Sequence, residues 1–164
     1  MNRDPKTIKA SYPMKKSEPI LKAIARPTIQ IIFQCEAANG YWAILLHESH
    51  QYKTAFRTCI GHYCYRRMGQ GLTGGPATYT RLKDLAMGPI PGPEGEPALA
   101  GVASDTMLKS FMDDNFGEAD TVMDLYNLLH HHYFPRLAWA RLTLSSPTSK
   151  FVVTSLDILG HIKP

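Results

Sequence analysis

Hydrophobic and polar positions along the chain follow two periods, one typical of strands and one of helices. Residues 28–35 form a mainly apolar run rich in β-branched residues, which predicts a buried strand ending at Glu36. A second run over 107–112 predicts another strand, which leads directly into Asp113 and Asp114. The polar residues and glycine that follow indicate that the chain turns back after this acidic pair. Both apolar runs therefore end in acids.

Three segments have the features of helices. They cover residues 17–26, 77–86 and 120–133. The third is the clearest, because Val122, Leu125 and Leu129 recur at helical spacing and share one face. Pro135 follows, and we expect it to end this helix. The first segment is expected to be a short helix that Pro27 stops.

The remaining segments predict short strands and one long loop. The expected strands cover 52–58 and 62–68, joined as a hairpin around Ile60-Gly61, and 142–144, 150–154 and 156–159 near the C-terminal end. Residues 88–104 are rich in proline and glycine and are expected to form an exposed loop inside a single domain over 1–164. Mixed helices and hairpin-like strands predict an α+β fold with a mainly antiparallel sheet.

Composition narrows the class of protein. The chain has 164 residues, 44% of them hydrophobic, which is enough for one domain with a core. Its net charge of +4 is compatible with a polyanionic partner but does not require one. An odd number of cysteines predicts reduced thiols and an intracellular location, cytoplasmic or nuclear. Residues 1–16 lack the apolar segment of a secretory signal, and no apolar run approaches the roughly 18 residues of a membrane span, so no membrane partner is expected.

Glycines at 69, 71 and 74 match the spacing of a dinucleotide-binding loop between a predicted strand and a predicted helix. The acid that such a site needs about 20 residues later would fall in the 88–104 loop. A second parallel strand is also missing from the pattern. A tight turn that opens a helix is the favoured interpretation.

Histidine and cysteine residues offer two weaker metal-site candidates. His130, His131 and His132 point about 100° apart on a helix and cannot face one metal together, so a favourable position near the helix C-terminus explains them better. Cys59, His62 and Cys64 lack a fourth ligand at zinc-site spacing. Neither group predicts a metal site.

The acids at the strand ends are the stronger candidates. An acidic pair at a turn is usually only good turn chemistry, and Glu36 alone could be an ordinary exposed residue. If the strand over 28–35 lies beside the strand over 107–112, however, Glu36 joins Asp113 and Asp114 in one carboxylate cluster. Such a cluster suits two Mg²⁺ ions about 4 Å apart, the arrangement used for in-line phosphoryl transfer.

Several short stretches together resemble one known family. Phe111-Met112-Asp113-Asp114 resembles the Tyr/Phe-x-Asp-Asp box of reverse transcriptases. Further similar stretches follow the order of that family, namely Ala38-Asn39-Gly40-Tyr41-Trp42, Tyr52-Lys53-Thr54-Ala55-Phe56, Met68-Gly69-Gln70-Gly71-Leu72, Gly75-Pro76-Ala77-Thr78-Tyr79 and Leu159-Gly160-His161. The resemblance is to gypsy-type LTR retrotransposon polymerases, in particular fungal ones, and covers nearly the whole chain outside the 88–104 loop.

This resemblance implies a right-hand polymerase palm with part of the fingers, and helices packed on one face of the sheet. Asp113, Asp114 and Glu36 would be the catalytic carboxylates that bind Mg²⁺ or Mn²⁺. Tyr41 would pack against the sugar of the incoming nucleotide and exclude a 2′-hydroxyl.

The resemblance also implies binding positions for nucleotide and primer. Gln70 and Gly71 would touch the incoming nucleotide, a deoxynucleoside triphosphate. Leu159, Gly160 and His161 would approximate the primer-grip hairpin that positions an RNA or DNA primer on its template. The thumb, the ribonuclease H domain and the basic fingertip residues are expected to be absent.

One departure concerns the chemistry. The family has Asp where this chain has Glu36, and a carboxylate displaced by on the order of 1 Å can cost ~10²-fold in rate. The sequence therefore predicts a reverse-transcriptase fragment of a retroelement polyprotein, with template-directed nucleotidyl transfer that is impaired when the fragment acts alone. The alternative is a non-catalytic remnant of a palm that binds nucleic acid or another protein, and an unrelated metal hydrolase ranks third.

Overall fold

The computed structural model describes residues 12, 13, 16, 18, 22, 31–89, 108–158 and 160–163, with only the backbone of the last three. Most of the expected 88–104 loop, the first three residues of the expected 28–35 strand and Leu159 lie outside these residues. The expected helix over 17–26 also lies outside them, apart from Glu18 and Lys22. Both are helical, and their side chains form an ion pair of 2.8 Å.

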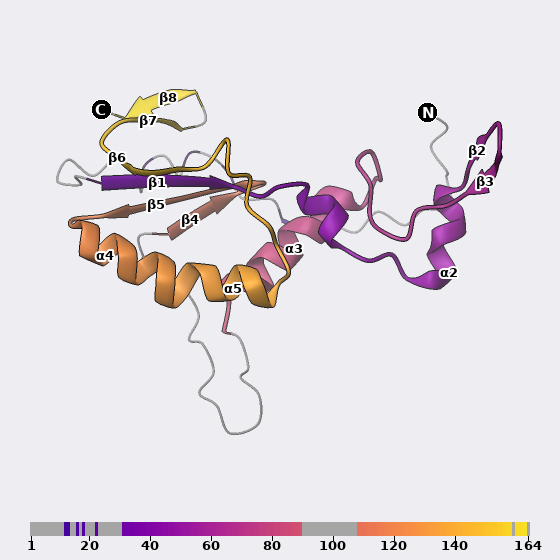
Figure 1. Cartoon of the computed structure of the whole chain (residues 1–164), viewed down its shortest axis with the longest axis horizontal. Coiled ribbons are helices and arrows are strands. Elements are labelled where there is room, and N and C mark those ends of the chain that lie inside the picture. Colours follow the sequence, from indigo (N-terminus) through magenta and orange to yellow (C-terminus); the bar gives the residue numbers. More distant parts are fainter. Residues whose placement is uncertain are drawn as a thin grey trace, which may run out of the picture.

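A four-stranded antiparallel sheet forms the centre of the molecule (Figure 1). Its strands are β1 (Ile31–Glu36), β4 (Leu108–Phe111), β5 (Asp114–Ala119) and β6 (Lys150–Val153). Their spatial order is β4-β5-β1-β6, so β5 and β1 occupy the middle. The predicted α+β class with a mainly antiparallel sheet is confirmed.

The middle strand β5 differs from the sequence prediction. The strand that ends at Glu36 was considered as a direct neighbour of the 107–112 strand, but β5 lies between β1 and β4 and pairs with both. The residues of β5 have low β-propensity, so no local pattern marked them as a central strand. Gly117 is required there, since a Cβ atom at this position would lie 1.9 Å from the ring of Phe33.

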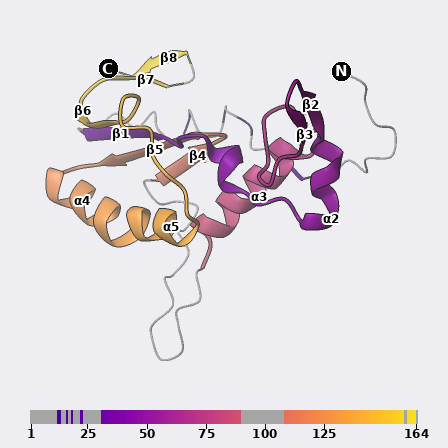
Figure 2. The ribbon, with the colours of Figure 1, turned by 45° about the vertical axis from the view of Figure 1, so that its right-hand side comes forward.

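Helices cover one face of the sheet and a small hairpin covers the other, as Figures 1 and 2 show. The helical face carries α3 (Gly75–Met87), α4 (Val122–Asn127), η3 (Leu128–Tyr133) and α5 (Phe134–Trp139). Because side chains alternate along a strand, Phe33 and Cys35 pack against these helices, while Ile32 packs on the opposite side. There the hairpin of β7 (Leu156–Ile158) and β8 (His161–Lys163) completes a second apolar cluster.

The predicted helix over 120–133 does not end at Pro135. The helical path continues through a six-residue π-helical segment, η3, into α5, where Pro135 occupies the first turn. Proline disturbs an α-helix by clashing with the carbonyl of the residue four positions earlier, and the wider π turn moves that carbonyl away. His130, His131 and His132 therefore lie exposed in the middle of the helical path and not at its C-terminus, which corrects that prediction.

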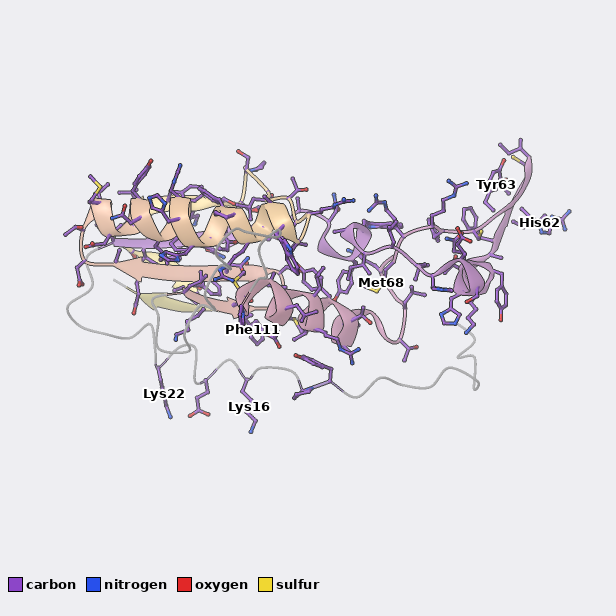
Figure 3. All side chains as sticks on the ribbon, turned by 90° about the horizontal axis from the view of Figure 1, so that it is seen from below. Lys16, Lys22, His62, Tyr63, Met68 and Phe111 are labelled. Atoms are coloured by element: carbon purple, nitrogen blue, oxygen red, sulfur yellow. The ribbon has the colours of Figure 1, made fainter. Side chains whose placement is uncertain are left out.

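A smaller group of elements follows β1 and extends away from the sheet, so that its hairpin lies at the far end of the molecule from β7 (Figure 1). It comprises η1 (Gly40–Ala43), α2 (Glu48–Gln51), η2 (Tyr52–Thr54), β2 (Phe56–Thr58) and β3 (Gly61–Tyr63). The predicted hairpin is confirmed, with shorter strands than expected and a helical turn over Tyr52–Thr54. Figure 3 labels His62 and Tyr63 on this hairpin, far from Phe111 of the sheet. In the part of the chain that is described, no helix is both long and apolar enough to cross a membrane.

The contact between Gly117 and Phe33 gives a stability prediction. Gly117→Ala should lower the free energy of unfolding by about 3 kcal/mol, because the added methyl group must displace a fully buried ring in the centre of the sheet. Chemical denaturation measures this change. Gly74→Ala is the matched control: a Cβ atom at Gly74 meets nothing within 4 Å, so its effect should stay below about 1 kcal/mol. Equal losses in the two variants would contradict the packing of Phe33 on β5.

Candidate acidic site at the end of the sheet

The turn between β4 and β5 carries the acidic pair. Phe111 pairs with Asp114, so Met112 and Asp113 form a two-residue turn between the strands. Met112 has φ of 45°, a left-handed conformation that is uncommon for a residue with a side chain. The surrounding contacts must therefore hold this turn in place.

Glu36 and Asp114 lie directly opposite each other on neighbouring strands. They are the last register pair of β1 and β5, and opposite residues of an antiparallel pair place their side chains on the same face. Gln34, two residues earlier on β1, donates a hydrogen bond of 3.3 Å from its Nε2 to Oδ1 of Asp114. The register of β1 and β5 therefore places Glu36 beside Asp114.

Asp113, in the turn, lies toward the helical face of the sheet. Its carbonyl oxygen accepts a hydrogen bond of 3.0 Å from the backbone N–H of Ala37, whose side chain belongs to the core on the helical face. Burial and the Asp113 carboxylate together raise the pKa of both Tyr41 and Tyr79, which places the carboxylate near these two rings. Oδ1 of Asp113 is buried and has no hydrogen-bond partner among the described residues.

Glu36 and Asp113 both raise the pKa of Asp114, so the three acids lie near one another at the end of the sheet. Asp114 shares a face with Glu36, and Asp113 in the turn lies near Tyr41 and Tyr79, so their union in one metal-binding cluster stays a prediction. Among the described residues, no group of three or more His, Cys, Asp or Glu side chains is arranged to hold a metal ion. The donor chemistry nevertheless suits a hard cation, because a carboxylate pair and an unpartnered buried carboxylate oxygen are the kind of ligands that Mg²⁺ and Mn²⁺ take.

Lys83 of α3 contacts the turn from the helical side of the sheet. Its Nζ donates hydrogen bonds to the carbonyl oxygen of Met112 and, at 3.2 Å, to that of Asp114. The same Nζ lies 5.8 Å from the centre of the Tyr79 ring. No motif in the sequence singled out Lys83 as a functional residue. The available signal was its position four residues after Tyr79, which places a lysine on the buried face of a helix.

Charges around Asp114 act in opposite directions on its protonation. Burial raises the pKa of Asp114 above its ordinary value, and the neighbouring Glu36 and Asp113 raise it further. The hydrogen bond from Gln34 and the positive charge of Lys83 lower it, but burial has the largest effect. The ionised form of Asp114 is therefore less favourable in the folded protein than in the unfolded chain.

Aromatic rings and a glycine-rich loop lie next to Asp113. The rings of Tyr41 and Tyr79 are 5.2 Å apart between centres, and Gly40 allows this approach because a Cβ atom there would lie 2.5 Å from Tyr79. The loop that contains Gln70 and Gly71 begins at Gly69, where a Cβ atom would lie 3.2 Å from Trp42. Gln70 and Gly71 are exposed, and Gly71 has φ of 89°, which favours glycine. The predicted nucleotide-binding residues thus lie in neighbouring segments.

The predicted primer-grip residues lie in the β7–β8 hairpin. Gly160 forms its turn with φ of 80°, and His161 begins β8. Leu156 and Ile158 of β7 pack against Ile32 and Phe116, on the sheet face that Glu36 and Asp114 share. Only the backbone of His161 is described, so the role of its side chain stays a prediction.

Solved structures show the same arrangement of elements. The chain superimposes on foamy viral protease-reverse transcriptase bound to an RNA/DNA hybrid with a TM-score of 0.72 and 18% identity, over 94% of this chain and 19% of that one. The superposition on the native prototype foamy virus protease-reverse transcriptase has a TM-score of 0.73 and 22% identity, over 96% of this chain and 19% of that one. The chain has the fold of a reverse transcriptase.

A sequence relative points in the same direction. The chain is 28% identical over 156 residues to the retrovirus-related Pol polyprotein from transposon 297 of Drosophila melanogaster. This match covers 95% of the chain but only 13% of the length of the polyprotein. No protein-family profile matches the chain.

The raised pKa of Asp114 predicts a pH-dependent cost to stability. Because the folded-state pKa lies above the unfolded one, protonation favours the folded form, and the cost appears as pH rises through and beyond the ordinary value of 3.8. Asp114→Asn should therefore raise the melting temperature by about 1–3 °C at pH 7 in the absence of metal, with the difference disappearing near pH 4.

Thermal melts across this pH range, in the presence of a chelator, measure the effect. Asp157→Asn, on the exposed position of β7, is the control for a general change in charge and should leave the melting temperature nearly unchanged. A destabilised Asp114→Asn variant at pH 7 would contradict the electrostatic account.

Proposed function

We propose that this chain is the palm and part of the fingers of a retroelement reverse transcriptase of the gypsy type, similar to fungal elements. The proposal rests on one observation. In a reverse-transcriptase fold, the Phe111-Met112-Asp113-Asp114 turn lies beside the strand that ends at Glu36. The proposed reaction is the template-directed transfer of a nucleotide from a deoxynucleoside triphosphate to the 3′-hydroxyl of a primer.

Glu36, Asp113 and Asp114 would hold two Mg²⁺ or Mn²⁺ ions. Bound there, the ions would lower the pKa of the primer hydroxyl and stabilise the charge that develops on the phosphates. Glu36 and Asp114 are register partners on neighbouring strands, and Glu36 and Asp113 both act electrostatically on Asp114, which supports a shared site for the three carboxylates.

Tyr41, Gln70 and Gly71 would form the nucleotide pocket. Tyr41 lies near the Asp113 carboxylate and packs on Tyr79, so its ring is fixed beside the acidic turn. There it would contact the sugar of the incoming nucleotide and exclude a 2′-hydroxyl. Gln70 and Gly71 are exposed in the adjoining loop, where their polar groups are accessible to a nucleotide.

Nucleic acid is the proposed partner of the β7–β8 hairpin. The structural relatives were solved in complex with an RNA/DNA hybrid and with double-stranded DNA, which supports an RNA or DNA template-primer here. Leu159, Gly160 and His161 would position the primer end through the backbone of the β7–β8 turn, for which the left-handed φ of Gly160 provides the bend.

Activity of this chain alone is proposed to be low. Glu36 extends its carboxylate one methylene farther than an aspartate would, and misplacement by on the order of 1 Å can cost ~10²-fold in rate. The chain spans 19% and 24% of the length of the foamy viral proteins that it matches.

Primer extension on an RNA template with Mg²⁺ or Mn²⁺ tests this function. The wild-type chain should extend a primer slowly, Glu36→Asp should extend it at least about tenfold faster, and Asp113→Asn should abolish extension. Asp120→Asn serves as the control, since this exposed acid follows β5 at the end of the strand away from Asp114. Fast synthesis by the wild type, or no gain in Glu36→Asp, would contradict the proposed impairment; activity that survives Asp113→Asn would contradict the assigned site.

A non-catalytic palm that binds nucleic acid or another protein is the second candidate. It is favoured by the lack of a metal-holding group of three or more side chains among the described residues. Binding to a labelled template-primer at several salt concentrations distinguishes these cases. Salt-dependent binding without extension would support a nucleic-acid-binding remnant, whereas no binding would favour a protein partner.

A further inference from the structure

Lys83 is a buried cation directly beneath the acidic turn. Only 3% of its surface is exposed, although lysine is almost never fully buried unless its charge is compensated. It belongs to α3, on the same helical face as Tyr79 and Ala86, which are also buried. A structural role in packing alone would be served as well by an apolar side chain, so the charge requires an explanation.

The hydrogen bonds of Lys83 frame Asp113. Its Nζ donates to the carbonyl oxygens of Met112 and Asp114, the residues immediately before and after Asp113. Backbone carbonyls at the two sides of a turn are thus held by one ammonium group, much as oxygen ligands surround a bound cation. This contact also supports the left-handed conformation of Met112.

The charge of Lys83 opposes the repulsion among the carboxylates. Glu36 and Asp114 are register partners at the end of the sheet, and Nζ of Lys83 contacts the backbone on both sides of Asp113. Lys83 and a divalent ion would therefore act on the same negative charges, from the helical side and from the open end of the sheet respectively. Two cations that share counter-charges repel each other, so the presence of one weakens the binding of the other.

We propose that Lys83 is the resident counter-ion of the acidic turn, a positioning residue that holds Asp113 and Asp114 in place without metal and weakens the binding of divalent ions. The inference rests on the metal site of the proposed function. Its specific consequence is that Lys83 forms the turn before a metal ion binds. The positive charge of the same side chain then lowers the affinity of the site for the metal ion.

Metal binding provides the first test. Lys83→Met removes the charge at similar length, and Lys83→Gln removes it but keeps an N–H donor for the turn carbonyls. Free Mn²⁺, measured by electron paramagnetic resonance during titration of the chain, should show a dissociation constant about tenfold lower in both variants than in the wild type. Lys53→Met, the same substitution at an exposed position of η2 at the other end of the molecule, should bind Mn²⁺ as the wild type does.

Thermal melts provide a second readout that does not depend on activity. With a chelator present, Lys83→Met should melt at least about 5 °C below the wild type, because the turn loses its anchor, while Lys53→Met should not. Saturating Mn²⁺ should recover part of this loss in Lys83→Met, since a ligand that binds only the folded state stabilises it. Far-ultraviolet circular dichroism confirms that each variant is folded; if Lys83→Met does not fold, Lys83→Gln carries the comparison.

The outcomes separate this inference from the proposed function. In one outcome, the wild type binds Mn²⁺, Asp113→Asn abolishes this binding, and the folded Lys83 variants bind Mn²⁺ no more tightly than the wild type. That result would overturn the counter-ion role but would support the metal site. Absence of Mn²⁺ binding in the wild type and in both Lys83 variants would overturn the metal site and this inference together. Binding that appears only when Lys83 is replaced would support the inference in its strongest form.

Discussion

Antiparallel pairing of β1 with β5 is the contact on which the rest of the structure depends. It places a strand with strong β-propensity beside one with little, and it requires Gly117 so that the ring of Phe33 can cross β5. The same register sets Glu36 opposite Asp114 and distributes apolar residues to both faces. The helical layer, the β7–β8 hairpin and the acidic end of the sheet all follow from this one pairing.

The acidic end is stabilised by groups that do not themselves carry the proposed chemistry. Gln34 and Lys83 favour the ionised form of Asp114, against burial and the nearby acids. Lys83 also fixes the backbone on both sides of Asp113. Concentrated negative charge lowers stability unless it is compensated, and here the compensation comes from an amide and an ammonium group supplied by β1 and α3.

The fold is similar to that of solved reverse transcriptases, but this chain corresponds to only a part of their length. The foamy viral structures match 94–96% of this chain, yet the chain accounts for 19–24% of their length. The acidic end of the sheet therefore lies within a fold that this chain shares with a part of much longer proteins.

The sequence by itself determined the strand that ends at Glu36, the acidic turn, the hairpin at β2–β3 and α3, because each has a local pattern of apolar spacing or turn residues. It also identified the family resemblance through short motifs. Only the tertiary structure decided that β5 is a central strand, that the helical path passes Pro135 through a π segment, and that Asp114 is the register partner of Glu36. These features depend on long-range pairing and packing, which override weak local propensity. The buried position of Lys83 under the turn belongs to the same group, since 29 residues separate it from Met112 and only the packing of α3 on the sheet brings the two together.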